Sequence, residues 1–161
     1  MRFVKVEPMK TDTVLKPELC NCLALRQAAR HVTQFYDRFL AGAGLRTTQF
    51  SILAKLRRLG PMTISALAAD LVMDRTTLGR NLQPLEREGL VAIVPGRYDR
   101  RSREIRLTEA GAERLRDAIE GWVKAQIGFE AVFGAQRSSE LREILHAVSA
   151  SELERAAPEP G

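Results

Sequence analysis

Two clusters of side chains in the middle of the chain have the chemistry to contact nucleic-acid bases. The first cluster follows Asp74 and comprises Arg75, Thr76, Thr77, Arg80 and Asn81. An arginine can pair bidentately with guanine, an asparagine can pair with adenine, and a threonine can contact a phosphate or a thymine methyl group. The alternative interpretation is the solvated face of an amphipathic helix.

The second cluster is a run of arginines between residues 97 and 106. Its candidate DNA contacts are Arg97, Asp99, Arg100, Arg101 and Arg103. The run also contains Arg106 and Glu104, so its five arginines and two acidic residues give a net charge of +3 over ten residues. A short arginine-rich loop suits the DNA minor groove, because the narrow groove concentrates negative potential. A solvated loop is the other interpretation, but the position directly after the first cluster favours the groove.

Both clusters need a scaffold, and the apolar spacing predicts one. Thr63 can cap one short helix and Asp74 a second, which ends at Gly89. The inward positions of the second helix are Leu78, Leu82 and Leu85. Two strand candidates follow, 90–94 and 104–107. Two short helices and a ribbon form a winged helix-turn-helix, whose second helix lies in the DNA major groove.

Longer helical segments flank this lobe on both sides. One helix is predicted from Pro17 to Leu40 and another from Thr47 to Leu59. A long helix capped by Thr108 follows the ribbon, and Ser138 or Ser139 opens a last helix. The predicted fold is therefore mainly α with a small β-wing. The expected regions are an N-terminal arm (1–16), a helical dimerisation region (17–60 with 108–155), a winged helix-turn-helix lobe (61–107) and a flexible tail (156–161).

The composition indicates a globular chain with a mild basic excess. The 161 residues carry a net charge of +5, with 20 Arg and 5 Lys, and 45% are hydrophobic. The excess of arginine over lysine favours bidentate recognition of phosphate and guanine. High-GC codon usage would produce the same excess. No apolar run approaches the roughly 18 to 20 residues of a membrane span, and Met1–Lys16 lacks the apolar core of a secretory signal. We therefore expect no membrane association and a cytoplasmic protein.

Enzymatic and metal chemistry find little support in the sequence. No paired general base, glycine-rich phosphate loop or Ser/His/Asp arrangement is present, so neither catalysis nor a cofactor is expected. Cys20 and Cys22 lie two residues apart, and on a helix their side chains would diverge by about 200°. His31 and His146 have no ligand spacing to the cysteines, so no metal site is expected.

The segment from Leu45 to Gly111 resembles a MarR-type regulator. The similarity lies in TTQFSILAKL, ISALAADLVMDRTTLGRNLQPLEREGLV, the Asp99-Arg100-Arg101 wing segment and LTEAG, and the flanking helices extend it to roughly 17–153. The resemblance implies an obligate homodimer that binds double-stranded DNA at a near-palindromic site. It also implies a repressor released by a small molecule or an oxidant. The first cluster matches the recognition helix, and Asp99 with Arg101 matches a wing pair in which the acid orients the arginine.

Two positions depart from the family pattern. The family often has glycine in the turn between the two short helices, where this chain has Val72. Because a β-branched residue tolerates the left-handed conformation poorly, we expect Val72 to keep a negative φ. Pro84 deletes a hydrogen bond to the carbonyl of Arg80 and should bend the helix there or begin its end.

The signal that controls such a regulator has two candidates. CLALRQAAR resembles the first helix of the organic-hydroperoxide-sensing branch, with Cys22 at the reactive thiol and Tyr36 at a tyrosine that hydrogen-bonds it. Thr47 replaces that branch's second tyrosine, and a buried structural cysteine is the other interpretation of Cys22. The second candidate is a small aromatic or phenolic acid, with Tyr36, Phe50 and Trp122 as candidate residues of its pocket. A place in the hydrophobic core is the other interpretation of Trp122. Competing functions are a thiol-based peroxide-reactive protein using Cys22 and an interaction module without DNA binding.

Overall fold

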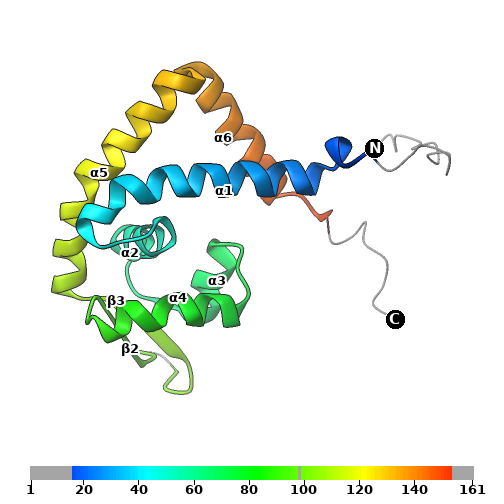
Figure 1. The fold of residues 1–161 in the computed structure, drawn as a ribbon. Helices are drawn as coiled ribbons and strands as arrows, with labels where there is room; N and C mark the ends of the chain where they lie inside the picture. Colours follow the sequence, from blue (N-terminus) through cyan, green and yellow to red (C-terminus); the bar gives the residue numbers. More distant parts are fainter. Residues whose placement is uncertain (1–15, 98, 154–161) are drawn as a thin grey trace. The chain divides into compact units, whose positions relative to one another are not determined.

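The computed structural model of the chain describes residues 16–97 and 99–153 (Figure 1). The N-terminal arm and the C-terminal tail expected from the sequence lie outside the described residues, except for Lys16. The chain divides into two compact units, 1–35 and 36–161. Each unit is described by itself.

The first unit contains a 3-10 turn, Pro17–Leu19, and the first part of helix α1 (Asn21–Leu40). The prediction of one continuous helix from Pro17 was wrong at its start. Cys20 lies between the two elements with an extended backbone (ψ 108°), and its sulfur accepts a hydrogen bond from the N–H of Leu23 at 3.4 Å. The cysteine therefore occupies the capping position of α1, where an acceptor for an early helical N–H is needed.

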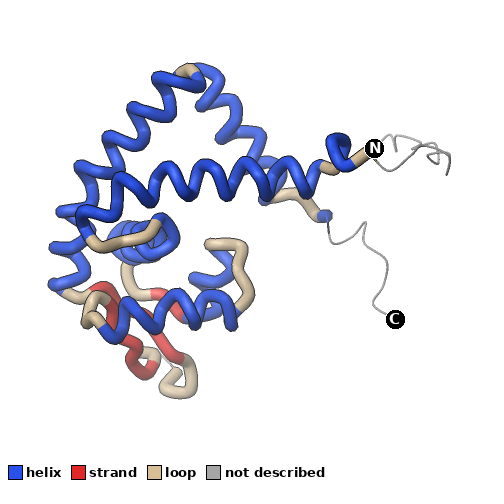
Figure 2. The backbone as a smooth tube through the Cα atoms, viewed as in Figure 1, coloured by secondary structure: helices blue, strands red, loops and turns tan. Residues whose placement is uncertain are grey.

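The second unit holds the remaining helices and one small sheet (Figure 2). Its elements are a 3-10 turn (Ala41–Ala43), α2 (Thr47–Leu59), β1 (Met62–Thr63), α3 (Ile64–Asp70), α4 (Arg75–Arg87), β2 (Val91–Pro95), β3 (Arg103–Leu107), α5 (Glu109–Phe133) and α6 (Ala135–Ser149). The mainly α fold with a small β-wing is confirmed. The three helix caps predicted from Thr63, Asp74 and Thr108 are also confirmed, because each side chain accepts a backbone N–H three residues later.

The sheet contains one strand more than predicted in the described part of the chain. Its order is β1-β3-β2, with both pairings antiparallel. Ile105 at the centre of β3 is fully buried and faces Met62 on one side and Ile93 on the other. β1 is two residues long, which is too short to show the period-two pattern by which a strand is recognised.

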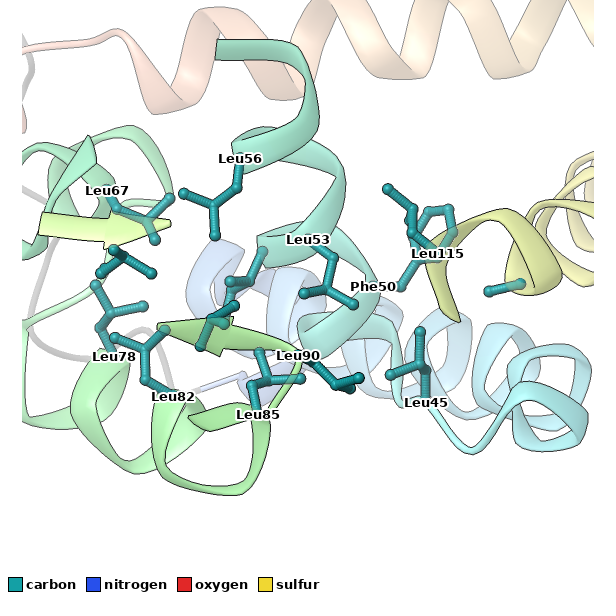
Figure 3. Packing of buried hydrophobic residues seen from close by; sticks show 14 of the residues in the cluster. Leu45, Phe50, Leu53, Leu56, Leu67, Leu78, Leu82, Leu85, Leu90 and Leu115 are labelled. Carbon is teal, nitrogen blue, oxygen red and sulfur yellow. The ribbon is translucent and has the colours of Figure 1, made fainter. Parts of the chain in front are cut away.

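One continuous apolar core runs through the second unit (Figure 3). Leucines from α2, α3 and α4 meet side chains of the strands and of α5. Its fully buried members include Leu40, Ile52, Leu53, Leu67, Leu78, Leu82, Leu85, Val91 and Ile105. This core contains residues from both the helical region and the winged lobe expected from the sequence. The division between those two regions therefore stays a prediction.

A carboxylate from the end of α1 anchors the start of α2. The backbone N–H and the hydroxyl of Thr47 both donate to Asp37 Oδ1, each at 2.7 Å. Burial alone would raise the pKa of Asp37, but the Thr47 hydrogen bonds and the charge of Arg46 hold the pKa of that carboxyl below its ordinary value. The anchor joins residues ten positions apart, so no local capping pattern announces it.

The start of α6 differs from the expectation that Ser138 or Ser139 would open it. Gly134, with φ 97°, ends α5 and directly precedes the first residue of α6, Ala135. Ser138 is buried inside the helix, and its hydroxyl donates to the carbonyl of Gly134 at 2.7 Å. The serine hydroxyl therefore bonds back to the preceding turn, and a left-handed glycine makes the junction between the helices.

The expectation of a negative φ at Val72 was wrong, because its φ is 51°. The N–H of Met73 donates to Ala68 O at 2.8 Å, and the N–H of Val72 donates to Ala69 O at 3.1 Å. This pair of bonds is the Schellman motif, which ends a helix and requires a left-handed residue at the position Val72 occupies. The bonded turn fixes the backbone, and the β-branched, 74% exposed side chain is strained by it.

Replacing Val72 should therefore stabilise the protein. We expect Val72→Gly to raise the free energy of unfolding by about 1 kcal/mol, which corresponds to about 2–4 °C in Tm for a chain of this size. Val72→Ala keeps a Cβ atom and should recover only part of the gain. Thermal unfolding followed by circular dichroism measures both, and a lower Tm for the glycine variant would contradict the strain.

Candidate nucleic-acid interface

Packing holds helix α4 in place against its own poor helix propensity. Leu78, Leu82 and Leu85 are all at most 1% exposed. A helix-interior Gly79 costs about 1 kcal/mol relative to alanine and an interior Pro84 about 3 kcal/mol. Truncating one buried leucine typically costs about 2–5 kcal/mol, so three leucines together outweigh both penalties. The apolar face therefore decides how this helix is oriented.

Pro84 lies at the beginning of the last turn of α4. The helix continues to Arg87, and then Gly89 adopts a left-handed φ of 71°. The N–H of Glu88 donates to the carbonyl of Pro84 at 3.0 Å, so the turn that begins at the proline is the last one. The prediction that the proline begins the end of the helix agrees with this geometry.

A network of short hydrogen bonds fixes the start of α4. Asp74 Oδ1 accepts the backbone N–H of Thr77 at 2.8 Å, and Asp74 Oδ2 accepts the Thr77 hydroxyl at 2.6 Å. The Thr77 hydroxyl and then its N–H hold the pKa of Asp74 below the ordinary value. One turn later, the side-chain amide of Asn81 donates to the carbonyl of Thr77 at 2.8 Å.

These bonds divide the five predicted contact residues of α4 into two groups. Thr77 and Asn81 direct their polar groups to the helix itself. Arg75, Thr76 and Arg80 are exposed on the first half of the helix. The sequence places all five on one helix, but it does not reveal that the side chains of Thr77 and Asn81 form hydrogen bonds within that helix. The spacing Asp-x-x-Thr is the signal that could have indicated the capping role of Thr77.

The predicted arginine-rich loop connects β2 and β3 as a tight turn. The N–H of Gly96 donates to the carbonyl of Ser102 at 2.8 Å, and the Ser102 hydroxyl donates to Asp99 O at 2.7 Å. A Cβ atom on Gly96 would lie 2.5 Å from the backbone oxygen of Asp99, so only glycine fits there without a shift of the turn. The turn thereby presents Arg100 and Arg101 as exposed residues.

The role expected for Asp99 differs from the contact that it makes. We expected the carboxylate to orient the Arg101 side chain. In the structure, Asp99 Oδ1 accepts the backbone N–H of Arg101 at 2.9 Å. The carboxylate thus shapes the turn from which Arg101 projects. The Arg97 and Arg103 side chains are exposed at the two ends of the same loop.

Glu104 organises the base of the loop, a role that the sequence did not reveal. Its Oε1 accepts the backbone N–H of Arg97 at 2.9 Å, and its Oε2 lies 3.3 Å from the Arg106 guanidinium. The Arg97 hydrogen bond, with Arg106, holds the pKa of Glu104 below its ordinary value. Arg106 is therefore paired with Glu104 within the sheet.

A cavity of about 510 Å³ lies next to α2 and α5. All three aromatic residues predicted to line it do so, and the rings of Phe50 and Trp122 stack with centroids 6.1 Å apart. Tyr36 donates a hydrogen bond to Gln126, and its pKa is raised by burial and by the nearby charge of Glu130. The remaining lining residues are Thr47, Ser51, Ala54, Lys55, Arg57, Arg58, Leu115 and Ile119.

The cysteines belong to the first unit, and Tyr36 belongs to the second. Cys20 and Cys22 are both exposed, so the buried structural role considered for Cys22 is not found in the single chain.

Within 16–97 and 99–153, no group of three or more His, Cys, Asp or Glu is arranged to hold a metal ion. No helix in the same ranges has the length and apolar character to cross a membrane.

Comparison with known proteins identifies the relatives of this arrangement. Residues 45–102 match the model of the MarR family. The regulator PecS of Dickeya dadantii is 31% identical over 68% of each chain, and the transcriptional activatory protein BadR of Rhodopseudomonas palustris is 36% identical over 60% of this chain. The BadR match spans 58% of BadR's own length. The M. tuberculosis regulator MosR, solved in complex with DNA, is 38% identical with a TM-score of 0.70 and covers 81% of this chain and 97% of its own.

A capped helix that follows a tight turn and precedes an arginine-rich β-ribbon defines a winged helix-turn-helix protein. The chain belongs to the MarR family of DNA-binding transcriptional regulators. Its relatives in this comparison are regulators of transcription.

The cap of α4 predicts a pH-dependent stability. A carboxyl whose pKa is lowered on folding stabilises the protein above its unfolded pKa, and this contribution is lost as the pH falls through the folded pKa. We expect Asp74→Ala to lower Tm at pH 7 and to approach wild type below the ordinary pKa of 3.8. Asp74→Asn, which keeps an acceptor for the Thr77 N–H, should lose less at pH 7. Melting curves from pH 7 to pH 3 measure the difference, and an unchanged gap at low pH would contradict it.

Proposed function

We propose that the chain is a homodimeric transcriptional repressor that places α4 in the DNA major groove and the β2–β3 loop in the minor groove. The observation that carries the proposal is the exposure of Arg75 and Arg80 on a capped helix that precedes an arginine-rich turn. MosR, solved in complex with DNA, is 38% identical to this chain and supports binding to DNA. In this proposal the winged helix-turn-helix lobe (61–107) contacts DNA. The dimerisation region comprises 17–60 and 108–155.

Exposed apolar residues on α5 and α6 support a second copy as the partner of this chain. Val132 is 91% exposed, and Ile127 and Ile144 are each more than 60% exposed. An exposed apolar surface of this kind typically marks an interface. Two copies related by a twofold axis would present two reading helices about 34 Å apart, which matches one turn of DNA.

The proposed contacts predict distinct losses for the two elements. On a duplex selected by the wild-type protein from random DNA, Arg80→Ala should weaken binding by about 1–3 kcal/mol if Arg80 reads a base. Arg101→Ala should weaken binding to selected and random duplexes alike and lower the salt dependence by about one charge per subunit. Mobility-shift titrations at several salt concentrations measure both effects.

Arg106→Ala provides the matched control for Arg101→Ala, because Arg106 is paired with Glu104 in the sheet. We expect its effect on affinity to be smaller than that of Arg101→Ala. Wild-type affinity in Arg101→Ala, with an intact dimer, would contradict the assignment of the loop. In-vitro transcription from a promoter that contains the selected duplex tests whether the protein represses. We expect less transcript when the protein is added, and more transcript would contradict the proposed repressor role.

We further propose that a small aromatic anion in the cavity releases the protein from DNA. Stacked aromatic rings and three basic residues, Lys55, Arg57 and Arg58, suit such a ligand. Lys55 also forms an ion pair with Asp70, the last residue of α3, at 2.8 Å. An anion bound by Lys55 would compete with Asp70 and loosen α3, which supports the reading helix.

This competition predicts opposite effects of two variants on ligand binding. Lys55→Met removes the charge that attracts the ligand, whereas Asp70→Asn frees that charge from its competitor. With a panel of hydroxybenzoic acids, we expect about two- to fivefold weaker binding for Lys55→Met and tighter binding for Asp70→Asn by a similar factor. The fluorescence of Trp122, the single tryptophan of the chain, is the readout.

Release by thiol oxidation is the other route that we consider. Cys22 is exposed, as a thiol that reacts with peroxide must be. If oxidation is the signal, Cys22→Ser abolishes release from DNA by an organic hydroperoxide. Unchanged release in that variant would remove both the thiol route and the alternative of a peroxide-reactive protein using Cys22.

Identical ligand affinities in the Lys55 and Asp70 variants would remove the competition mechanism.

A further inference from the structure

Gly79 lies inside α4, where nothing in the described chain requires glycine. Its backbone φ is not in the left-handed region, and a Cβ atom built on it meets nothing within 4 Å. Two glycines of α5 differ in this respect. A Cβ atom would lie 2.0 Å from Leu90 O at Gly111 and 2.4 Å from Phe39 O at Gly121. Glycine in a helix interior lowers stability by about 1 kcal/mol relative to alanine. Since alanine would fit at position 79, the packing of the chain does not explain the glycine.

The position of Gly79 relates this space to the proposed reading residues. Helical spacing puts Thr76 one turn before Gly79 and Gln83 one turn after it, on the same side of the helix. Both of these residues are exposed, as is the adjacent Arg80. The preceding residue, Leu78, is fully buried in the core. Gly79 therefore makes a notch on the flank of α4, between the buried leucine face and the exposed polar face.

The chemistry of the notch favours an apolar occupant. In an α-helix interior, the N–H and the carbonyl of a residue are bonded to the preceding and following turns, so they offer little to a phosphate. What Gly79 exposes is its Cα–H group, with the threonine and glutamine side chains one turn away. In the major groove, the apolar group that projects from the base edges is the 5-methyl group of thymine.

We propose that Gly79 is a specificity-determining residue, whose missing side chain leaves room for the 5-methyl group of one thymine in each half-site. This inference rests on the proposed function, because it requires α4 to lie in the major groove. The contact is one of shape. An alanine methyl group at position 79 and a thymine methyl group would compete for the same space, whereas a uracil, which lacks the methyl group, would leave it open.

The test combines a larger side chain with a smaller base. A duplex selected by the wild-type protein from random DNA is prepared with each thymine of a half-site replaced, one at a time, by deoxyuridine. We expect one position at which deoxyuridine weakens the wild-type protein about fourfold, the value of one buried methyl group. Gly79→Ala should bind the unmodified duplex at least tenfold more weakly and regain most of that loss with deoxyuridine at this position.

Two controls separate this inference from the proposal on which it rests. Gly79→Ala should melt at or above the wild-type temperature, because alanine favours the helix. Gly42→Ala, at an exposed glycine that also has open space, should leave the affinity and the deoxyuridine profile unchanged. Wild-type affinity in Gly79→Ala, or a loss that no deoxyuridine relieves, overturns the inference alone. A wild-type protein that selects no sequence overturns the proposed function as well.

Discussion

The burial of three leucines on one side of α4 is the constraint on which the proposed DNA-contacting surface depends. Leu78, Leu82 and Leu85 pack into the same core as leucines of α2 and α3 and the central strand of the sheet (Figure 3). Because these side chains fix the rotation of the helix about its axis, the polar residues between them have to face outward. The arginines of α4 thus owe their exposure to packing on the opposite side of the helix. Glycine and proline are tolerated within it for the same reason.

Short polar contacts complete what packing begins. Asp74 ties down the first turn of α4 through Thr77, and Asp99 and Glu104 tie down the arginine-rich turn through backbone N–H groups. Acidic side chains near a DNA-binding surface weaken binding, because they repel the negatively charged phosphates. Each of these carboxylates, however, accepts a hydrogen bond from its own loop or helix. They therefore order the backbone from which the arginines project.

The parts of this arrangement that were predicted from the sequence all depend on neighbours within about four residues. The caps of α3, α4 and α5 and the leucine face of α4 are of this kind. The sequence did not predict the anchor between Asp37 and Thr47 or the pairing of β1 with β3, because these join distant parts of the chain. At Val72 a correct residue preference led to a wrong conformation, since the hydrogen bonds that end α3 outweigh the strain of one side chain. In the site, the exposed arginines followed from the helical period, whereas the inward bonds of Asn81 and Thr77 depend on side-chain rotamers.

The proposed function requires a dimer that contacts DNA with two copies of α4. Selection of bound sequences from a random DNA pool by the wild-type protein tests it most directly. A dimer with one α4 helix in each of two successive major grooves should enrich a near-palindrome whose half-sites are centred about one helical turn, or 10 base pairs, apart. No enrichment, or enrichment of a single half-site without its symmetric partner, would contradict it.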